Sequence, residues 1–221
     1  MKKELNNLIY DLSNTVEFFN ELGADFVKKD LSLNKEIDLD SLNETILKCR
    51  KCPLHLTRTQ AVPGEGNPKA QLMFAGEAPG RDEDIQGRPF VGRAGQLLTK
   101  IIKAMNFERK EVYITNIVKC RPPNNRNPQQ KEIEACHPYL LSQIRQIKPR
   151  VIVALGKVAA EFFVPGCSSI SAVRGTFHDF HGIPVMPTFH PSYLIRDESN
   201  KERKKLVWFD MKKVMVLLGK R

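Results

Sequence analysis

Long apolar runs are missing from this 221-residue sequence. No stretch approaches the roughly 20 apolar residues of a membrane-spanning helix. The first residues also lack the basic segment and apolar core of a secretory signal peptide, because acidic side chains interrupt their apolar ones. Internal repeats and long low-complexity tracts are absent as well. These absences favour one ordinary globular domain with a sizeable core, and we expect it to be cytoplasmic.

Cysteines are few, and their number is odd. The five are Cys49, Cys52, Cys120, Cys136 and Cys167. An odd count in a chain without a signal peptide argues against a disulfide framework. A metal or cluster site is the better explanation for the first four, and we take Cys167 as an ordinary thiol.

Acidic residues are in the majority only near the N-terminus. Residues 1–40 hold five basic and nine acidic residues, whereas residues 41–221 hold thirty basic and sixteen acidic ones. The two parts therefore carry net charges of −4 and +14, which add to the +10 of the whole chain. A basic body suggests a polyanionic partner, with nucleic acid the first candidate, although a solubilising surface charge gives the same count.

The sequence pattern separates an N-terminal extension, residues 1–41, from a body, residues 42–221. Apolar residues near helical spacing predict an amphipathic helix over residues 4–27, and a polar linker follows over residues 28–41. A short helix is expected from about Leu42. The extension carries none of the patterns that indicate chemistry in the body.

Short apolar strands alternate with helices in the body. The pattern predicts strands over residues 71–75, 112–118, 151–155, 176–180 and 183–186, the last two forming a hairpin. Asn127 is predicted to cap a helix that begins at Pro128, and Pro138 to kink or split that helix. Helices are also predicted over residues 95–105, after Gly156 as far as Phe163, and over residues 201–218.

The alternation of strands and helices predicts a single three-layer α/β/α domain with a mostly parallel central sheet. In such sheets, sites form in loops beyond the carboxyl ends of the strands. The segments around Gly76, Asn116 and His190 all follow predicted strands, so we expect them to meet at one edge of the sheet.

Four cysteines have the chemistry of a metal or cluster site. Cys49 and Cys52 form a C-x2-C pair, Cys120 follows a predicted strand, and Cys136 lies on the next helix. Four thiolates can bind zinc or an iron–sulfur cluster. The fifteen residues between Cys120 and Cys136 fit a zinc ribbon poorly. Four buried free thiols are the alternative. Basic residues flank the four and would offset thiolate charge: Arg50, Lys51, Lys119 and Arg121.

Three ordered segments carry further motifs. They are GEAPG at residues 76–80 with Glu83, Asp84 and GRPFVGRAG at residues 87–95, then TNIVKCRPPNNR at residues 115–126, and HPSYLIR at residues 190–196. Together with the cysteine arrangement, they resemble the family 4 uracil-DNA glycosylases, which are the iron–sulfur type. The resemblance covers roughly residues 42–218 and leaves the extension outside.

The resemblance implies a base-excision-repair enzyme that flips uracil out of DNA and hydrolyses its N-glycosidic bond. It implies a [4Fe–4S] cluster bound by Cys49, Cys52, Cys120 and Cys136. We expect a monomer that acts on uracil-containing DNA, single- or double-stranded. No lysine in the motifs is placed to form a Schiff base, so we expect a monofunctional enzyme that leaves an abasic site.

Base recognition is assigned to the same motifs. Phe90 corresponds to the family's stacking residue, and Asn116 to the amide that reads the Watson–Crick edge of uracil. His190 corresponds to the donor that stabilises negative charge on uracil O2. A core phenylalanine, a turn-forming asparagine and a structural histidine are the respective alternatives. Uracil contacts are expected from Gly76, Glu77, Ala78, Phe90, Asn116 and His190.

Glu77 and Glu83 are the candidates for orienting and deprotonating the attacking water, and with His190 they form the predicted catalytic set. Leu194 is predicted to enter the base stack as an apolar wedge. Phosphate contacts are predicted for Arg88, Arg93, Arg126 and Arg196. A cluster-bearing nucleic-acid-binding module and a glycosylase of broader base preference are the competing hypotheses, and Glu77 argues against the second.

Overall fold

The computed structural model describes residues 38–220 except residue 198. The predicted helix over residues 4–27 lies outside these described residues. Helix α3, Leu39–Leu47, begins inside the predicted linker, because Asp38 accepts a hydrogen bond from the Ser41 N–H and caps it. None of the helices in this part of the chain is long and apolar enough to cross a membrane.

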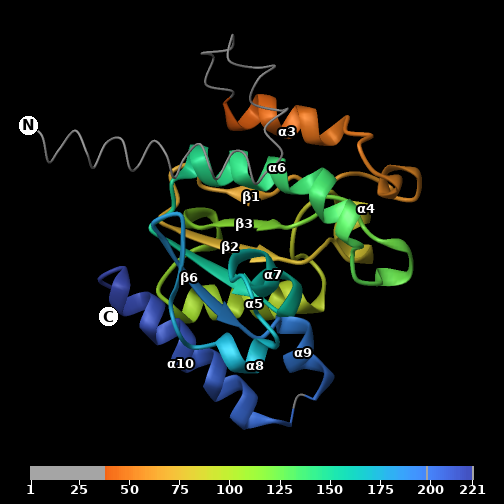
Figure 1. The fold of residues 1–221 in the computed structure, drawn as a ribbon. Coiled ribbons are helices and arrows are strands. Elements are labelled where there is room, and N and C mark those ends of the chain that lie inside the picture. The colour runs from red at the N-terminus through yellow and green to blue at the C-terminus, as the bar shows by residue number, and fades with distance from the viewer. Residues whose placement is uncertain (1–37, 198, 221) are drawn as a thin grey trace, which may run out of the picture. The chain divides into compact units, whose positions relative to one another are not determined.

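The centre of the described chain is a six-stranded sheet with the order β1-β3-β2-β4-β6-β5 (Figure 1). The inner pairs β3–β2, β2–β4 and β4–β6 are parallel, and the two edge pairs are antiparallel. This confirms the mostly parallel sheet and the predicted hairpin. The strands are β1 Glu65–Gly66, β2 Leu72–Gly76, β3 Tyr113–Asn116, β4 Val151–Leu155, β5 His178–Phe180 and β6 Ile183–Thr188.

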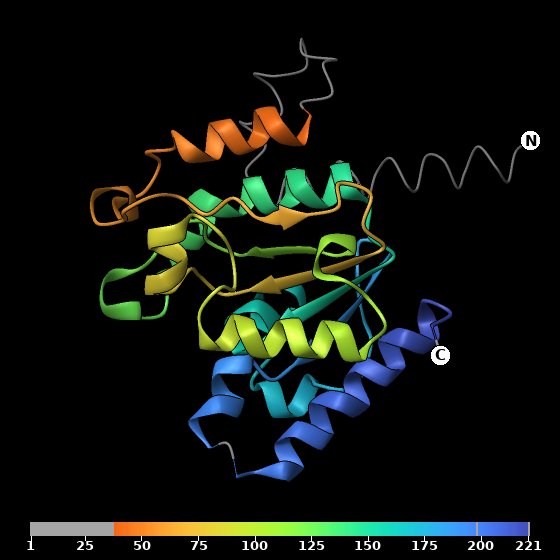
Figure 2. The same ribbon diagram turned by 180° about the vertical axis from the view of Figure 1, so that it is seen from behind.

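Helices cover both faces of the sheet, as Figures 1 and 2 show. The longer ones are α5 Arg93–Ala104, α6 Gln130–Ile147, α7 Lys157–Phe163 and α10 Lys201–Leu217. The shorter ones are α4 Arg81–Gln86, α8 Ile170–Val173 and α9 Pro191–Arg196, with 3-10 turns η1 Pro53–Leu56, η2 Arg109–Glu111 and η3 Pro123–Asn125. The predicted three-layer α/β/α architecture is therefore correct.

The central strand β2 shows why its sequence is a continuous apolar run. Leu72 and Phe74 pack into the core on the side of α5 and α10, whereas Met73 and Ala75 pack into the core on the side of α6 and α7. All of β2 is buried. A strand covered on both faces needs apolar side chains at every position, and this is typical of parallel sheets between helical layers.

The predicted start of α6 is wrong, and the helix is not split at Pro138. Asn127 does not cap the helix; Gln129 is the capping residue, and its N–H donates to the Glu132 carboxylate at 2.7 Å. Arg126 binds the same carboxylate, which favours the later start. Nor does Pro138 split the helix, which runs on to Ile147. Apolar burial on the sheet-facing side of α6 offsets the hydrogen bond that proline cannot donate.

The predicted strand over residues 112–118 is shorter in the structure. It ends at Asn116, although the chain stays beside the loop after β2, because Ile117 N–H donates to Gly76 O. Gly76 and Asn116 are register partners at the carboxyl ends of β2 and β3. The chain leaves β2 for β3 on one side and later enters β4 on the other, so β2 marks the topological switch point where ligands bind in such sheets.

Candidate active site

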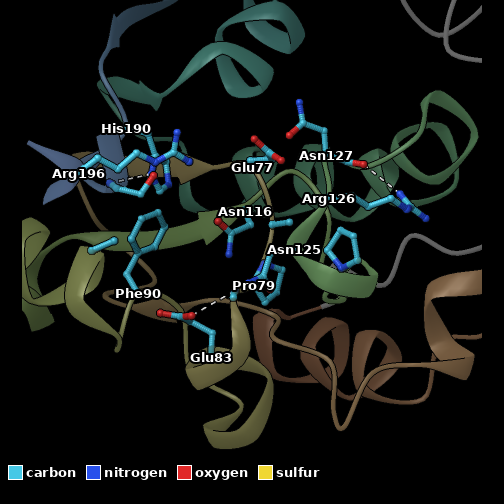
Figure 3. Close-up of a pocket in the computed structure, with 15 residues that line it drawn as sticks. Glu77, Pro79, Glu83, Phe90, Asn116, Asn125, Arg126, Asn127, His190 and Arg196 are labelled. Carbon is cyan, nitrogen blue, oxygen red and sulfur yellow. Dashed lines mark hydrogen bonds between the residues drawn. The ribbon is translucent and has the colours of Figure 1, made fainter. Parts of the chain in front are cut away.

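A pocket of about 360 Å³ lies beyond the carboxyl ends of the central strands. Figure 3 shows side chains from separate segments converging on it. Of the residues predicted to bind uracil or act in catalysis, Glu77, Ala78, Glu83, Phe90, Asn116 and His190 line it. Arg126 and Arg196, predicted to contact phosphate, line it as well. The remaining lining residues are not among the predicted site residues: Pro79, Gly80, Ala94, Pro122, Asn125, Asn127 and Ser192.

Gly76 lies where the side chains of Asn116 and Phe90 come together. A Cβ atom at this position would lie 2.5 Å from Asn116 Oδ1 and 2.5 Å from the Phe90 ring. Real Cβ contacts are essentially never below 3.0 Å, so only glycine lets both side chains occupy their positions. The Gly76 at the end of the apolar strand is therefore required by the pocket, and not only by the turn that follows.

Asn116 is 1% exposed, and its Oδ1 has no hydrogen-bond partner among the described residues. An unsatisfied buried carbonyl costs roughly 1–3 kcal/mol, so such groups are uncommon away from ligand sites. Its backbone oxygen, by contrast, accepts a hydrogen bond from the Lys119 ammonium at 2.7 Å. This hydrogen bond fixes the peptide of Asn116, whereas Oδ1 of its carboxamide remains available to a hydrogen-bond donor in the pocket.

Phe90 has a left-handed backbone conformation, with φ of 51°. Side chains rarely adopt this region without support from their surroundings. Glu83 supplies that support: its carboxylate accepts from the N–H groups of Val91 and Gly92 at 2.9 Å each and of Gly80 at 3.1 Å. The Arg109 guanidinium holds the other side of the loop by donating to Pro89 O. Phe90 is thus preset before any ligand arrives.

His190 caps α9 and faces Phe90, with ring centroids 5.6 Å apart. The backbone N–H of Ser192 donates to its Nδ1 at 3.1 Å, and the Ser192 hydroxyl lies 2.7 Å from the same nitrogen. Burial, and then the positive charge of Arg196, lower the pKa of His190 to about 4. The imidazole is therefore neutral near pH 7, with its proton on Nε2.

The two predicted carboxylates differ in what they bind. Glu83 lines the pocket, but its oxygens accept the three backbone hydrogen bonds described above. Glu77 forms no hydrogen bond or ion pair with its side chain in the part of the chain that the structure describes. Burial raises the pKa of Glu77, and the negative charge of Glu161 adds to this shift. Glu77 is the carboxylate left available to a bound water.

The four predicted cluster ligands gather in one place. Cys120 and Cys136 are buried in a small core, and Cys49 and Cys52 pack against it. Burial, with smaller contributions from neighbouring thiolates, raises the pKa of Cys136 to about 12 and that of Cys120 above its ordinary value. Among residues 38–197 and 199–220, no three Cys, His, Asp or Glu side chains are close enough to hold a single metal ion.

Cationic groups and N–H donors surround these sulfurs. The Arg58 guanidinium donates to Cys120 Sγ at 2.8 Å. The backbone N–H of Lys119 donates to Cys136 Sγ at 3.2 Å, and that of Lys51 to Cys49 Sγ at 3.5 Å. Donors of this kind stabilise thiolate charge. The role of Arg58 was not predicted from sequence, because it lies outside the cysteine motifs.

The four arginines predicted to contact phosphate have different surroundings. Arg126 and Arg196 line the pocket, whereas Arg88 and Arg93 are not among its lining residues. The Arg126 guanidinium pairs with the buried carboxylate of Glu132 at 2.7 Å, and that of Arg88 with Glu65 at 2.8 Å. Arg126 therefore also anchors the loop before α6.

The structure contradicts Leu194 as an exposed wedge. Its side chain is 2% exposed and belongs to the core formed with α5 and α10. The unpredicted helix α9 turns Pro191 and Leu194 inward, three residues apart on one face. Tyr193, on another face of the same helix, is 36% exposed.

The pocket at the switch point of this α/β/α domain combines an aromatic wall, a neutral histidine and an unsatisfied amide oxygen. Comparison with known proteins identifies the family. The model of the uracil DNA glycosylase superfamily matches residues 63–212. The chain belongs to this superfamily.

Relatives that share 45–50% identity with this chain are type-4 uracil-DNA glycosylases. A type-4 uracil-DNA glycosylase of Thermotoga maritima is 50% identical over 184 residues, covering 82% of this chain and 95% of that protein. The type-4 enzyme of Archaeoglobus fulgidus is 45% identical over 83% of this chain and 94% of that protein. The type-4 enzyme of Sulfurisphaera tokodaii is 47% identical over 81% of this chain and 84% of that protein. The resemblance stated from the motifs is confirmed.

Proposed function

We propose that this protein is a uracil-DNA glycosylase: it takes uracil out of the DNA stack, hydrolyses the bond between the base and the sugar, and leaves an abasic site. The observation that carries the proposal is the buried, unbonded Oδ1 of Asn116 in a pocket that Phe90 and His190 also line. It is an acceptor in need of a donor, next to a ring on which a flat base can stack.

Uracil supplies the missing partner. Its N3–H can donate to Asn116 Oδ1, while its O4 accepts from the same carboxamide through Nδ2. Cytosine offers an acceptor at N3 and an amine at position 4, so both contacts would be repulsive. A site built to satisfy a buried polar group rejects an analogue that leaves the group unpaired by orders of magnitude. We therefore assign base reading to Asn116 and stacking to Phe90.

His190 is assigned to the leaving group. As the bond between uracil N1 and sugar C1′ breaks, the electron pair passes to the base and charge accumulates on O2. The Nε2–H of a neutral imidazole can donate to that oxygen without adding a full positive charge to the pocket. A preorganised donor of this kind contributes on the order of 3 kcal/mol to the transition state.

Glu77 is assigned to the water. The attacking water adds its oxygen to C1′, and its proton must leave as the new bond forms. The carboxylate also stabilises positive charge on the sugar during the reaction. Glu83 is assigned to holding the Phe90 loop, because its oxygens already accept backbone hydrogen bonds. No lysine is among the lining residues in the described part of the chain, which supports hydrolysis without a Schiff base.

DNA binding follows from the basic body. Arg126 and Arg196 at the pocket, with Arg88 and Arg93 nearby in sequence to Phe90, are proposed phosphate contacts. Neutralising phosphates releases counterions, so affinity for DNA should fall steeply between low and moderate salt.

We further propose that Cys49, Cys52, Cys120 and Cys136 bind a [4Fe–4S] cluster. A single zinc ion bonds sulfur at about 2.3 Å and draws four thiolates tightly together. The four thiols share one small core, which supports a cluster whose irons they would bind together. When bound, such a cluster supplies a cross-link between the segment after α3, the end of β3 and α6, and one-electron redox chemistry.

The cluster is tested on protein purified without oxygen. Broad visible absorbance with four irons and four sulfides per chain is expected. Colourless protein that contains one zinc per chain would contradict the proposal.

The enzymatic activity is tested by base release. Oligonucleotides carrying one uracil, one hypoxanthine or no lesion are incubated with excess enzyme, and free base and abasic strand are quantified. Release of uracil alone, without strand cleavage, is expected. Release of hypoxanthine at a comparable rate supports a glycosylase of broader preference, and DNA binding without any release supports a non-catalytic module; either result contradicts the proposal.

A further inference from the structure

Lys119 is a buried basic residue between the cysteine core and the pocket. It is 1% exposed, and its ammonium donates to Thr115 Oγ1 at 2.6 Å, Asn116 O at 2.7 Å and Gln143 Oε1 at 2.8 Å. All three of its N–H bonds therefore have acceptors. None of these acceptors carries a charge.

A buried ammonium normally requires a negative partner, because removing it from water costs several kcal/mol. No carboxylate forms an ion pair with Lys119 in the part of the chain that the structure describes. Lys119 directly precedes Cys120 in the sequence, and its backbone N–H donates to Cys136 Sγ at 3.2 Å. The residue therefore contacts the proposed cluster site with its main chain and the Asn116 peptide with its side chain.

The acceptors around the ammonium form a closed network. Gln143 Nε2 donates to Pro63 O at 2.9 Å and lies 3.2 Å from the Tyr113 hydroxyl. Thr115 Oγ1 donates to Pro63 O at 3.0 Å. Buried networks in which every member is satisfied hold their groups in one arrangement. The member at the pocket end is the peptide oxygen of Asn116, whose carboxamide is the proposed base reader.

We propose that Lys119 is a positioning residue that couples the cysteine cluster site to the base-reading carboxamide of Asn116. This inference rests on the function proposed above. The side chain of Lys119 fixes the end of β3 through the Asn116 peptide oxygen, while the main chain of the same residue is bonded to a proposed cluster ligand. Removing the side-chain donor frees the Asn116 peptide, so uracil binds less tightly although Phe90, His190 and Glu77 are unchanged.

The test compares the loaded parent protein with Lys119→Met, which keeps an unbranched side chain one atom shorter and removes the hydrogen-bond donors and the charge. A displaced Asn116 carboxamide binds uracil less tightly in the ground state and in the transition state alike. KM should therefore rise about tenfold or more while kcat changes little. The inhibition constant of free uracil should rise by a similar factor. The reduction potential of the cluster, measured by voltammetry, should become more negative, because a nearby cation stabilises the reduced form.

Lys110→Met is the matched control, since Lys110 is exposed and pairs only with Glu108 among the described residues. This variant should have the parental KM, the parental inhibition constant of free uracil and the parental reduction potential of the cluster. A parent that releases no uracil overturns the proposed function. An active parent whose Lys119→Met variant keeps parental KM and uracil inhibition overturns the positioning role. A raised KM with an unchanged potential overturns the coupling to the cluster.

A second variant covers the case in which Lys119→Met does not load iron. Thr115→Val removes one acceptor of the same ammonium and keeps its charge. It should retain iron and a near-parental potential and raise KM and the uracil inhibition constant severalfold. Parental values of both constants in this variant overturn the proposal.

Discussion

The backbone N–H of Ser192 donates to Nδ1 of His190 at 3.1 Å, and this contact determines which imidazole nitrogen carries the proton. Nδ1 is the acceptor, so Nε2 is the donor in the neutral ring. The serine two residues after the histidine was part of a recognised motif, yet its contribution comes from its main chain. The same contact would be lost if Nδ1 were protonated, which agrees with the lowered pKa of His190.

His190 should therefore remain neutral, as the Nε2–H tautomer, at every pH at which the enzyme is assayed. Its folded pKa of about 4 lies below the ordinary value of 6.5, so between these values the unfolded chain binds a proton that the folded chain does not. This group's contribution to stability is complete above pH 6.5 and declines as the pH falls toward 4. Nitrogen-15 NMR of the imidazole should show the neutral pattern at pH 6, and an imidazolium signal there would contradict the assignment.

Gly76→Ala should abolish uracil release without unfolding the protein. The new Cβ would lie 2.5 Å from Asn116 Oδ1 and from the Phe90 ring, so both must move out of the base site. We expect a loss of at least about 100-fold in kcat/KM, since a displacement of about 1 Å in a site costs this much. Circular dichroism and iron content check the fold. Gly166→Ala is the control for a glycine-to-alanine change without a clash, because no atom lies within 4 Å of the new Cβ.

Asn116→Asp should change base choice. An ionised carboxylate offers only acceptors, so it cannot donate to uracil O4, whereas it can accept from the exocyclic amine of cytosine. Uracil excision should fall by orders of magnitude, and some cytosine release is expected, limited by the poorer leaving group. Single-turnover release from matched uracil- and cytosine-containing strands measures this. Near-normal uracil release would show that Asn116 does not read the base.

Glu77→Gln and Glu83→Gln should separate chemistry from loop positioning. The first removes the proposed base and should lower kcat by about 10²–10⁴, with little effect on KM. Because burial raises the pKa of Glu77, parental activity should fall with acid at a pH above the ordinary 4.5, and the variant should lack this limb. Glu83→Gln loosens the Phe90 loop and should act mainly on KM. Pre-steady-state rates measured over a range of pH distinguish the role of Glu77 in chemistry from that of Glu83 in loop positioning. Equal kcat losses in both variants would contradict this division of roles.

Arg174→Ala should destabilise the fold by about 3–5 kcal/mol. The Arg174 guanidinium pairs with Asp210, which is 1% exposed and also accepts from the Thr188 hydroxyl at 2.6 Å. Removing the arginine leaves a buried carboxylate without its counter-charge. Lys205→Ala, which breaks an exposed ion pair with Glu202 on the same helix, should cost less than about 1 kcal/mol. Denaturant unfolding of both variants tests the contrast, and similar losses would contradict it.

Local patterns in the sequence were sufficient for the main elements of the fold. The apolar run over residues 151–155 is β4 with the same bounds, because a strand covered on both faces must be apolar throughout. The turn at His181 and Gly182 joins the predicted hairpin. The strand pattern also predicted that the segments around Gly76, Asn116 and His190 meet at one edge of the sheet, and residues of all three segments line the pocket.

Partners distant in sequence were decided only by the tertiary structure. Glu83 was a candidate base until its carboxylate was found on the N–H groups of Val91 and Gly92. Leu194 was a candidate wedge until α9 turned it into the core. Hydropathy and spacing report which face of an element is buried, but not which donor meets which acceptor. Those pairings depend on where separate segments come to lie, as Lys119 does between the cysteines and Asn116.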